Sequence, residues 1–388
     1  MNNEKRLLLI LSKPTLTDKD IEQASFLFAN GQICWDTLFS LSIHHKTIVT
    51  VYKNLRKMGV RYDNKWGHFI GVYAGGNSLR NQFLYDCVTP AMNGLFEAGI
   101  IAVPLKGAYL NHKVYESYDI RQCGDFDVLV KEEDITSVIR VLEQHGFIQS
   151  KARDLNGDLI PASRQLKAYH RLYTHELVPF MKRVDNPLLN YIEIDVHFDI
   201  FSRSQNHIVS LPQHELFRTA TPFKINRERL LCHELSVELN LIQISSHIYR
   251  DNTILQNILQ KKDHILRDYI DLRELIVKHK DSIEWGSLCR ISTEYGVNNI
   301  LYYTFYYLEQ LYGELIPAEF MQAIAPQDRD YLNRYGFEEI ESQVWDLPFI
   351  ERLFKNRSEC SDFVGLTVTK SYSNMLRQES NTNNNTER

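Results

Sequence analysis

The sequence feature that most constrains the fold is YIEIDVHFDIF at residues 191–201, where polar and apolar side chains alternate almost throughout. Side chains two residues apart on an extended strand point to the same face of a sheet. One face of this segment is apolar, and the other carries Glu193, Asp195, His197 and Asp199. The alternation predicts a strand that packs one face on a core and gathers titratable groups on the opposite face.

A second segment, DFDVLV at residues 125–130, places two more carboxylates on a predicted strand. Asp125 and Asp127 project together, while Phe126 and Val128 occupy the packed side. Two like charges about 6–7 Å apart repel each other, so this arrangement costs free energy where the strand is buried. Aspartates at a strand end also cap turns or contact water, so the pair alone leaves both interpretations open. A divalent cation would stabilise the pair, because Mg²⁺ prefers carboxylate oxygens as ligands.

A third carboxylate would join this pair if the two acidic strands lie side by side. Three carboxylates on adjacent strands suit a two-metal site for phosphoryl or nucleotidyl transfer. Two of them would bind both metals, and the third would help to draw a proton from the incoming nucleophile. Glu193 competes with Asp195 for the third position, and Asp195 is preferred because the acidic-apolar-His pattern centres on it.

Upstream of both acidic segments, GIIAVPLKG at residues 99–107 predicts a short buried strand that ends in a glycine turn before a helix. Backbone N–H groups at the start of a helix favour phosphate, and Lys106 adds a positive charge beside Gly107. Such turns are common in α/β proteins, so this one is not specific by itself. Together with the two acidic strands that follow it, the turn predicts a site that handles phosphate groups.

Helical periodicity flanks this strand-rich part on both sides. Before it, the pattern predicts helices at residues 15–31, 34–59 and 78–98, and after it the chain reads as helical from Leu211 into the 330s. The whole pattern predicts an α+β fold with a small mixed β-sheet core. The predicted divisions are an N-terminal helical region at 1–98, an α/β core at 99–205, a C-terminal helical domain at 206–370 and a disordered tail at 371–388.

Charge and cysteine content restrict the class of partner. The net charge of −5 at pH 7 argues against bulk binding to nucleic acid or to an anionic membrane, although a local basic patch is compatible with it. The six cysteines are scattered, which is typical of reduced thiols. No stretch approaches the roughly 20 apolar residues of a membrane span. These features predict a cytoplasmic protein without a membrane partner.

Motifs of several other enzyme classes are missing from the sequence. None of the His-Glu pairs is followed by the second histidine of H-E-x-x-H, and the chain has no G-x-S-x-G, P-loop or G-x-G-x-x-G. The cysteines also lack the spacing of a metal site. The acidic strands are therefore the strongest chemical signal in the chain.

Three blocks of the chain resemble a known family. VPLKGAYL, then VYESYDIRQCGDFDVLVKEEDITSVIRVLEQHGF, then EIDVHF are similar to the nucleotidyltransferase superfamily of the DNA polymerase β type. More narrowly, they resemble the bacterial family of uncharacterised nucleotidyltransferases, whose core reads L-K-G, R-x-x-x-D-h-D-h-h-V and h-[DE]-h-H. Helical segments on both sides extend the resemblance over most of the chain.

The resemblance implies a sheet flanked by helices, Mg²⁺ dependence with two ions, and transfer of a nucleoside monophosphate from an NTP with release of pyrophosphate. It implies that three carboxylates are catalytic and bind the metal: Asp125, Asp127 and Asp195. It also implies nucleotide binding by Lys106, Gly107 and Arg121. The superfamily's usual turn is Gly-Ser, whereas a lysine precedes a single glycine here, which leaves the contact with the triphosphate open.

Arg121 and His197 are nucleotide-binding candidates that also have a plain structural alternative. Arg121 would clamp a phosphate, or it would pair with Asp119 or Glu116 at the surface. His197 shares the polar face of the acidic strand, so it would hydrogen-bond a substrate or a carboxylate, or it would be a structural histidine.

Four further residues occur at positions similar to those of the family, and they are His175, His247, Arg267 and Asp271. His175 lies on a β-like segment, YTHELVPF, and a functional role competes with a structural one. Arg267 and Asp271 are four residues apart on a predicted helix, where they would form an ordinary surface pair or line the cleft.

The sequence therefore predicts a Mg²⁺-dependent nucleotidyltransferase that uses an NTP as co-substrate and a hydroxyl-type acceptor. The acceptor would be a small molecule, a peptide or a natural product, and the acidic pI argues mildly against an RNA end. Two alternatives stay open: an enzyme that transfers a phosphoryl or pyrophosphoryl group on the same scaffold, and a non-catalytic nucleotide-binding regulator.

Overall fold

A six-stranded sheet forms the centre of the protein, and the computed structural model describes it within residues 1–201, 209–336 and 343–355. Its strand order is β1-β2-β6-β5-β3-β4. Strands β2 and β6 pair in parallel, and the other neighbours pair antiparallel. The strands are β1 (Val103–Pro104), β2 (Phe126–Leu129), β3 (Ile148–Arg153), β4 (Leu159–Pro161), β5 (Phe180–Arg183) and β6 (Tyr191–His197). This mixed sheet with helices before and after it confirms the predicted α+β class.

The alternating segment forms β6, as its pattern predicts. Ile192, Ile194 and Val196 are fully buried, and β2 lies beside them with Phe126 opposite Ile194. The burial of this apolar face supplies the hydrophobic driving force that holds the acidic strand in the sheet. The same register places Asp127 of β2 opposite Asp195 of β6.

Two helices cover the apolar face of the sheet, and they are α5 (Asn64–Glu97) and α7 (Ile135–Gln144). Buried side chains of α5 share one core with the strands: Leu84, Tyr85, Val88, Ala91, Met92 and Leu95. The helix begins at Asn64, earlier than the predicted start near residue 78, and its N-cap residue Asp63 accepts a hydrogen bond from the backbone N–H of Lys65. A capped start therefore lengthens this helix beyond its apolar stripe.

Four shorter helices precede α5: α1 (Asn3–Leu11), α2 (Asp18–Asn30), α3 (Trp35–His44) and α4 (Ile48–Lys57). The predicted continuous helix over 34–59 is wrong, because the chain turns between α3 and α4. Lys46 adopts a left-handed backbone with φ 58°. The N–H of Lys46 donates to the carbonyl of Ile43, and the N–H of Thr47 donates to that of Ser42. These two bonds are the pattern that ends helices at a left-handed residue, a position usually occupied by glycine.

The segment after the sheet contains a hairpin as well as helices, so the prediction of helix throughout is wrong there. Strands β7 (Thr221–Ile225) and β8 (Leu230–Glu234) pair antiparallel around a polar turn. The N–H of His233 donates to the carbonyl of Ala102, which attaches the hairpin to the strand side of the core. Ile225, Leu230 and Cys232 pack in the same core as the helix α5. The short apolar runs on either side of the polar turn explain why a strand forms there.

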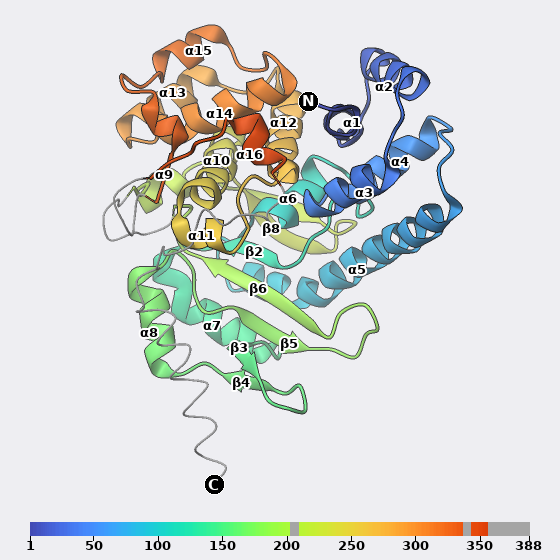
Figure 1. Ribbon diagram of the computed structural model, residues 1–388. Coiled ribbons are helices and arrows are strands. Elements are labelled where there is room, and N and C mark those ends of the chain that lie inside the picture. Colours follow the sequence, from blue (N-terminus) through green and yellow to red (C-terminus); the bar gives the residue numbers. More distant parts are fainter. Residues whose placement is uncertain (202–208, 337–342, 356–388) are drawn as a thin grey trace.

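Most of the remaining helices, those of the C-terminal part, gather above the sheet in the view of Figure 1. The remaining helices are α6 (Lys106–Lys113), α8 (Arg164–Tyr173), α9 (Gln213–Phe217), α10 (Val237–Thr253), α11 (Leu255–Leu259), α12 (Leu266–His279), α13 (Trp285–Glu294), α14 (Asn298–Tyr312), α15 (Ala318–Ala323) and α16 (Phe349–Leu353). A short pair, β9 (Arg334–Tyr335) and β10 (Gln343–Val344), lies near the end of the described chain. The predicted tail at 371–388 lies outside the described residues.

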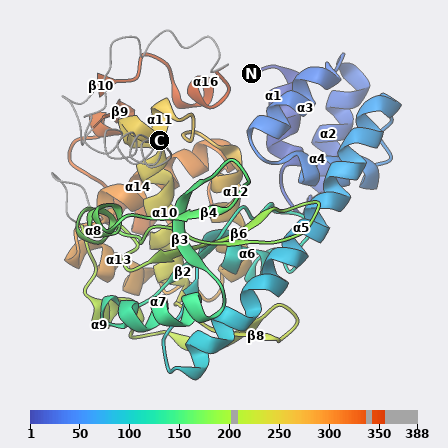
Figure 2. The same cartoon turned by 90° about the horizontal axis from the view of Figure 1, so that it is seen from below.

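The N-terminal and C-terminal helices lie on opposite sides of the molecule, as the two views agree (Figures 1 and 2). One hydrophobic core nevertheless joins them, because Leu38 and Phe39 of α3 belong to the same buried cluster as Leu266 and Leu272 of α12. Across the described residues, no helix combines the length and the apolar character needed to cross a membrane.

Candidate active site

The predicted carboxylates come together where β2 and β6 lie in register. Asp127 is buried on β2, and Asp195 is its register partner on the parallel strand β6. Asp125 comes directly before β2 and has the parity of Asp127, so its side chain points to the same face. Beyond the effect of burial, the charges of Asp125 and Asp127 raise the pKa of Asp195, and that of Asp127 raises the pKa of Asp125, so the three carboxylates lie close together. The structure therefore places the three predicted aspartates in one cluster.

Lys106 reaches this cluster from the start of α6. Its Nζ donates to Oδ1 of Asp127 over 2.7 Å, and its backbone is left-handed with φ 45°. Burial alone would raise the pKa of Asp127, but the charges of Lys106 and His197 outweigh burial and hold that pKa well below its usual range. Asp127 is therefore an anion that two neighbours hold in place.

His197 forms a hydrogen bond with the same oxygen of Asp127. Its Nε2 lies 2.8 Å from Oδ1 of Asp127, and only 2% of the residue is exposed. Because an ionised carboxylate only accepts hydrogen bonds, Nε2 of His197 must carry the proton. His197 makes the hydrogen bond to a carboxylate that was one of its predicted alternatives, and it thereby positions Asp127. A nucleotide contact of His197 stays a prediction.

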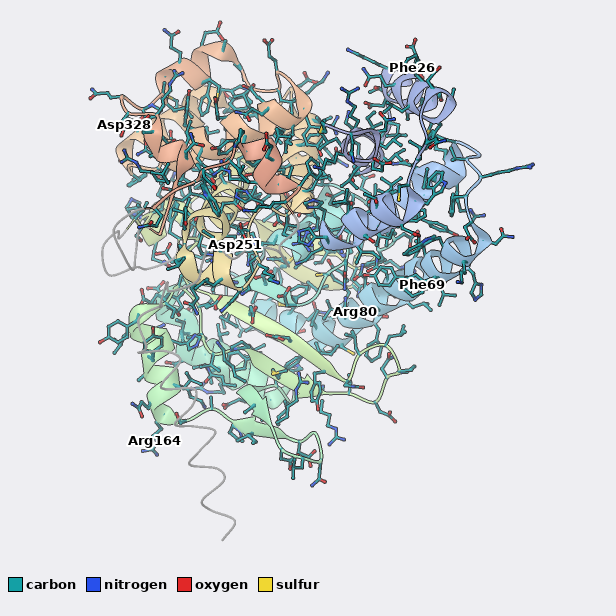
Figure 3. The ribbon with its side chains drawn as sticks, in the orientation of Figure 1. Phe26, Phe69, Arg80, Arg164, Asp251 and Asp328 are labelled. Carbon is teal, nitrogen blue, oxygen red and sulfur yellow. The ribbon has the colours of Figure 1, made fainter. Side chains whose placement is uncertain are left out.

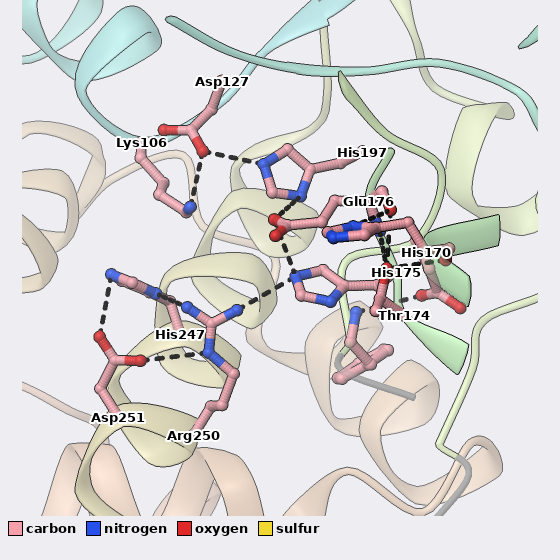
Figure 4. A network of polar contacts seen from close by, with 12 residues as sticks. Lys106, Asp127, His170, Thr174, His175, Glu176, His197, His247, Arg250 and Asp251 are labelled. Carbon is pink, nitrogen blue, oxygen red and sulfur yellow. Dashed lines mark hydrogen bonds and ion pairs between the residues drawn. The ribbon is translucent and has the colours of Figure 1, made fainter. Parts of the chain in front are cut away.

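A chain of polar contacts continues from His197 into the C-terminal helices (Figure 4). Nδ1 of His197 lies 3.7 Å from Oε2 of Glu176, and Nε2 of His175 lies 3.8 Å from the same oxygen. Nη1 of Arg250 donates to Nε2 of His175 over 3.1 Å, and Nε of Arg250 donates to Oδ1 of Asp251. Asp251 lies on α10, where these helices face the sheet (Figure 3). The network thus connects Asp127 to α10.

The charges along this network are fixed by burial and by the neighbouring groups. Burial would raise the pKa of Glu176, but His175 and His197 lower it to about 2. Burial, opposed by Glu176 and assisted by Arg250, lowers the pKa of His175 well below its ordinary value. His175 is therefore neutral at pH 7, and its Nε2 accepts the hydrogen bond from Arg250.

Asp195 is the carboxylate whose charge lacks compensation. Its Oδ1 is buried and accepts no hydrogen bond from any described residue. Burial raises the pKa of Asp195 well above its ordinary value, and Asp125 and Asp127 raise it further. Burial and Asp127 likewise raise the pKa of Asp125. An unpaired buried oxygen among like charges is the environment that a bound cation stabilises, and an all-oxygen donor set suits Mg²⁺.

A second group of potential ligands lies next to the aspartates. One atom from each of His175, Glu176 and His197 falls within 4.8 Å of the other two, as a metal with mixed nitrogen and oxygen ligands would require. The hydrogen bond from Arg250 already occupies Nε2 of His175 and brings a positive charge to it. The aspartate cluster therefore fits a cation better than this group does.

Arg121 supports the turn at Gly107 from behind. Its Nε donates to both oxygens of Asp271, over 2.8 and 3.0 Å, and both side chains are buried. A Cβ atom at Gly107 would lie 2.1 Å from Nη1 of Arg121, so only glycine fits there. The predicted surface pairs of Arg121 with Asp119 or Glu116, and of Arg267 with Asp271, are wrong. Asp271 is instead the buried partner of Arg121, which limits the predicted contact between Arg121 and phosphate.

Several residues of this site were missed by the sequence interpretation. Glu176 and Arg250 sit at the middle of the network, and the sequence interpretation gave neither of them a role. The adjacent pair His175–Glu176 in YTHEL was the available signal, because it places an acid beside a histidine. YTHELVPF is not a strand, since Tyr173 ends α8 and Glu176 forms only an isolated bridge with His197 before β5 begins at Phe180. The candidate His247 joins the network as well, because Nη2 of Arg250 donates to its Nδ1 over 2.9 Å. No local pattern predicts the role of Arg250, since that role depends on how α10 packs against the sheet.

The comparison with known proteins agrees with this geometry. The model of a family described as "Uncharacterised nucleotidyltransferase" matches residues 31–313, which is more than half of the chain. No curated protein and no solved structure matches the chain. The matched range contains the three aspartates, Lys106, the His175–Glu176 pair and Arg250. The chain belongs to this uncharacterised nucleotidyltransferase family and is an enzyme of the nucleotidyltransferase class.

Proposed function

We propose that this protein transfers a nucleoside monophosphate from an NTP to a hydroxyl group of an acceptor, with Mg²⁺ bound and pyrophosphate released. The observation that carries the proposal is the register of Asp127 with Asp195, together with the unpaired buried oxygen of Asp195. Such an oxygen among like charges costs free energy unless a cation balances it. A divalent cation with a triphosphate has the charge that matches this site.

Asp125, Asp127 and Asp195 would hold two Mg²⁺ ions, and their carboxylate oxygens are ligands of the right type. When bound, these ions supply charge neutralisation for the triphosphate and for the leaving pyrophosphate. Lys106 and His197 keep Asp127 ionised and hold its Oδ1, which leaves the second oxygen of this carboxylate to coordinate a metal. Asp195 would lie beside these ions and accept the proton that the hydroxyl nucleophile must lose.

The acceptor that we propose is a small molecule, a peptide or a natural product. A net charge of −5 disfavours a long nucleic acid, whose binding depends on many positive contacts. The described cysteines are free thiols, and this fits a reaction in the cytoplasm. The aspartates come from the segment 99–205, and the described helices before and after this segment would close over them.

Labelled nucleotides test the proposal. The protein is incubated with Mg²⁺, a fractionated extract of small molecules and peptides, and ATP labelled either at the α- or at the γ-phosphate, and the other three NTPs follow. Transfer of the α-label without the γ-label is expected. Transfer of the γ-label without the α-label would instead establish transfer of a phosphoryl or a pyrophosphoryl group. ATP labelled at the β-phosphate separates these two, because only a pyrophosphoryl group carries the β-phosphate with it.

A control variant separates enzymatic transfer from contamination. Asp195→Asn should abolish transfer of the α-label, while Asp119→Asn, which removes an exposed carboxylate paired with Lys53, should retain it. If no NTP binds to the wild-type protein with Mg²⁺ and no label moves, the enzyme proposal is wrong and a scaffold or regulatory role takes its place.

A further inference from the structure

The turn between α3 and α4 carries a lysine at a position that normally requires glycine. Lys46 has φ 58°, and the bonds of its own N–H and that of Thr47 close the end of α3. Glycine adopts this conformation without steric strain, whereas a lysine pays a penalty on the order of 1 kcal/mol. A side chain retained at such a position points to a role for that side chain.

This turn is attached directly to the start of α12. Nδ1 of His45 accepts a hydrogen bond from the backbone N–H of Leu266 over 3.2 Å. The carbonyl of His45 accepts another from the N–H of Arg267 over 3.3 Å. His45 itself is fully buried. Lys46 follows His45 directly in the chain. The two bonds therefore fix Lys46 beside the first turn of α12, which contains Arg267.

Lys46 and Arg267 form a pair of like charges. Among the described residues, Lys46 makes no ion pair, and its side chain is exposed to solvent. The charge of Arg267 lowers the pKa of Lys46 more than any other influence, and shielding by neighbouring atoms lowers it further. Arg267 donates Nε and Nη2 to Oδ1 of Asp268, which compensates one of the two positive charges. The charges of Asp268 and Asp251 act on Lys46 and partly oppose the effect of Arg267 on its pKa, without forming an ion pair with it among the described residues.

The same pair lies next to the aspartate cluster. The charge of Arg267 lowers the pKa of Asp125, against burial and Asp127, which raise it. One helical turn further along α12, Asp271 holds Arg121, whose side chain packs on Gly107. The start of α12 therefore borders the cluster on the side that faces the N-terminal helices, in agreement with the place of α12 in Figures 1 and 2.

Three other cations near the aspartates are already engaged by side chains. Lys106 donates to Asp127, Arg121 pairs with Asp271, and Arg250 bonds Asp251 and His175. Arg121 also packs closely against Gly107, so the Lys106–Gly107 turn contacts a protein side chain and not a phosphate. A triphosphate needs positive charge beyond the metal ligands, and the exposed ammonium of Lys46 can supply it.

We propose that Lys46 and Arg267 bind the terminal phosphates of the nucleoside triphosphate, in place of the Lys106–Gly107 turn that the sequence suggested. This inference rests on the proposed function, because it orients the nucleotide at that same site. The phosphate chain would run from the aspartates toward α12 and the turn at Lys46. The nucleotide would then connect the N-terminal helices to the C-terminal helices, and a monophosphate would be too short to do so.

Binding of Mg²⁺ with ATP, tripolyphosphate or AMP to the full-length protein tests the inference by calorimetry. Lys46→Met should weaken the binding of ATP and of tripolyphosphate roughly tenfold, the loss of one charged phosphate contact, and should change AMP binding less than about twofold. Lys46→Arg should restore most of the affinity. The matched control is Lys57→Met, which removes an exposed lysine from the end of the neighbouring helix α4.

The outcomes separate this inference from the proposed function. If Lys46→Met binds tripolyphosphate as tightly as the wild type and its KM for ATP is unchanged while the α-label is still transferred, the inference is wrong and the proposed function stands. If the wild-type protein binds neither ATP nor tripolyphosphate, both are wrong. Because Lys46 is exposed, its variants should melt at the wild-type temperature, and Arg267→Gln provides a second test from the other side of the pair.

Discussion

Nε2 of His197 lies 2.8 Å from Oδ1 of Asp127, the oxygen to which Nζ of Lys106 also donates. One carboxylate oxygen thus receives two donors, while Oδ1 of Asp195 on the neighbouring strand receives none from the described residues. The site is asymmetric for this reason. One aspartate is fixed and ionised by the protein, and the other depends on a ligand for its compensation.

The first prediction concerns this asymmetry. Asp127→Asn and Asp195→Asn should each reduce nucleotidyl transfer by several kcal/mol of activation free energy, on the order of 10³-fold or more in rate. Asp195→Asn should also raise the melting temperature of the metal-free protein, because it removes one of several repelling charges. Thermal denaturation with and without Mg²⁺ checks this. A lower melting temperature for the metal-free variant would contradict the assignment of charge repulsion at Asp195.

The second prediction concerns His197 as a positioning residue. His197→Ala should weaken Mg²⁺ binding about 10–100-fold, as is usual when a hydrogen-bond partner of a metal ligand is lost. His197→Gln, which can still donate to Asp127, should recover part of that loss. Calorimetric titration of Mg²⁺ in the presence of ATP measures both variants. Equal metal affinity in the wild type and His197→Ala would show that the bond to Asp127 has no role in coordination.

The third prediction concerns the buried ion pair of Arg121 and Asp271. Asp271→Asn should lower the free energy of unfolding by about 3 kcal/mol, because it leaves a buried guanidinium without its partner charge. Glu294→Gln is the matched control, since its pair with Arg290 on α13 is exposed to solvent and contributes little to stability. Urea denaturation of the three proteins measures the difference. Similar losses in the two variants would disprove the distinction.

The fourth prediction concerns pH and is independent of the metal site. Burial lowers the pKa of His112 on α6 from about 6.5 to about 4, and its ring lies edge-on to Tyr85 at 4.5 Å. Below pH 6.5 His112 is protonated in the unfolded chain but stays neutral in the native protein, so the free energy of unfolding falls as the pH drops toward 4. The slope from this group is at most about 1.4 kcal/mol per pH unit.

His112→Phe keeps a ring against Tyr85 and removes the titrating group, so it should flatten the stability profile between pH 6.5 and 4. The comparison variant is His68→Phe, which replaces an exposed histidine of α5 and should keep the wild-type profile. Equilibrium unfolding at a series of pH values provides the measurement. An unchanged slope in His112→Phe would exclude a contribution from this histidine.

Period-two alternation was sufficient to predict the central strands of the site. The proximity of Asp127 and Asp195 could be predicted, because each lies on a strand with one wholly apolar face and two such faces share a core. The family resemblance contributed the same residues independently. The turn at Gly107 was also found, but its physical reason, the close approach of Arg121, depends on a residue of α12 that no local pattern reveals.

Features that depend on tertiary packing could not be predicted. The break between α3 and α4 occurs at Lys46 without a glycine or proline to mark it, because bonds from α12 to His45 hold the turn in place. Arg250 reaches His175 only because α10 packs on the sheet. The hairpin of β7 and β8 also depends on tertiary packing, because its short strands pair with each other beside β1.

The most direct test of the central claim is a titration of Mn²⁺ followed by electron paramagnetic resonance, with a non-hydrolysable ATP analogue present. The wild-type protein should bind Mn²⁺, Asp127→Asn and Asp195→Asn should bind it at least about 100-fold more weakly, and Asp119→Asn should match the wild type. Wild-type affinity in both Asp127→Asn and Asp195→Asn would contradict the claim that β2 and β6 together hold the catalytic metal.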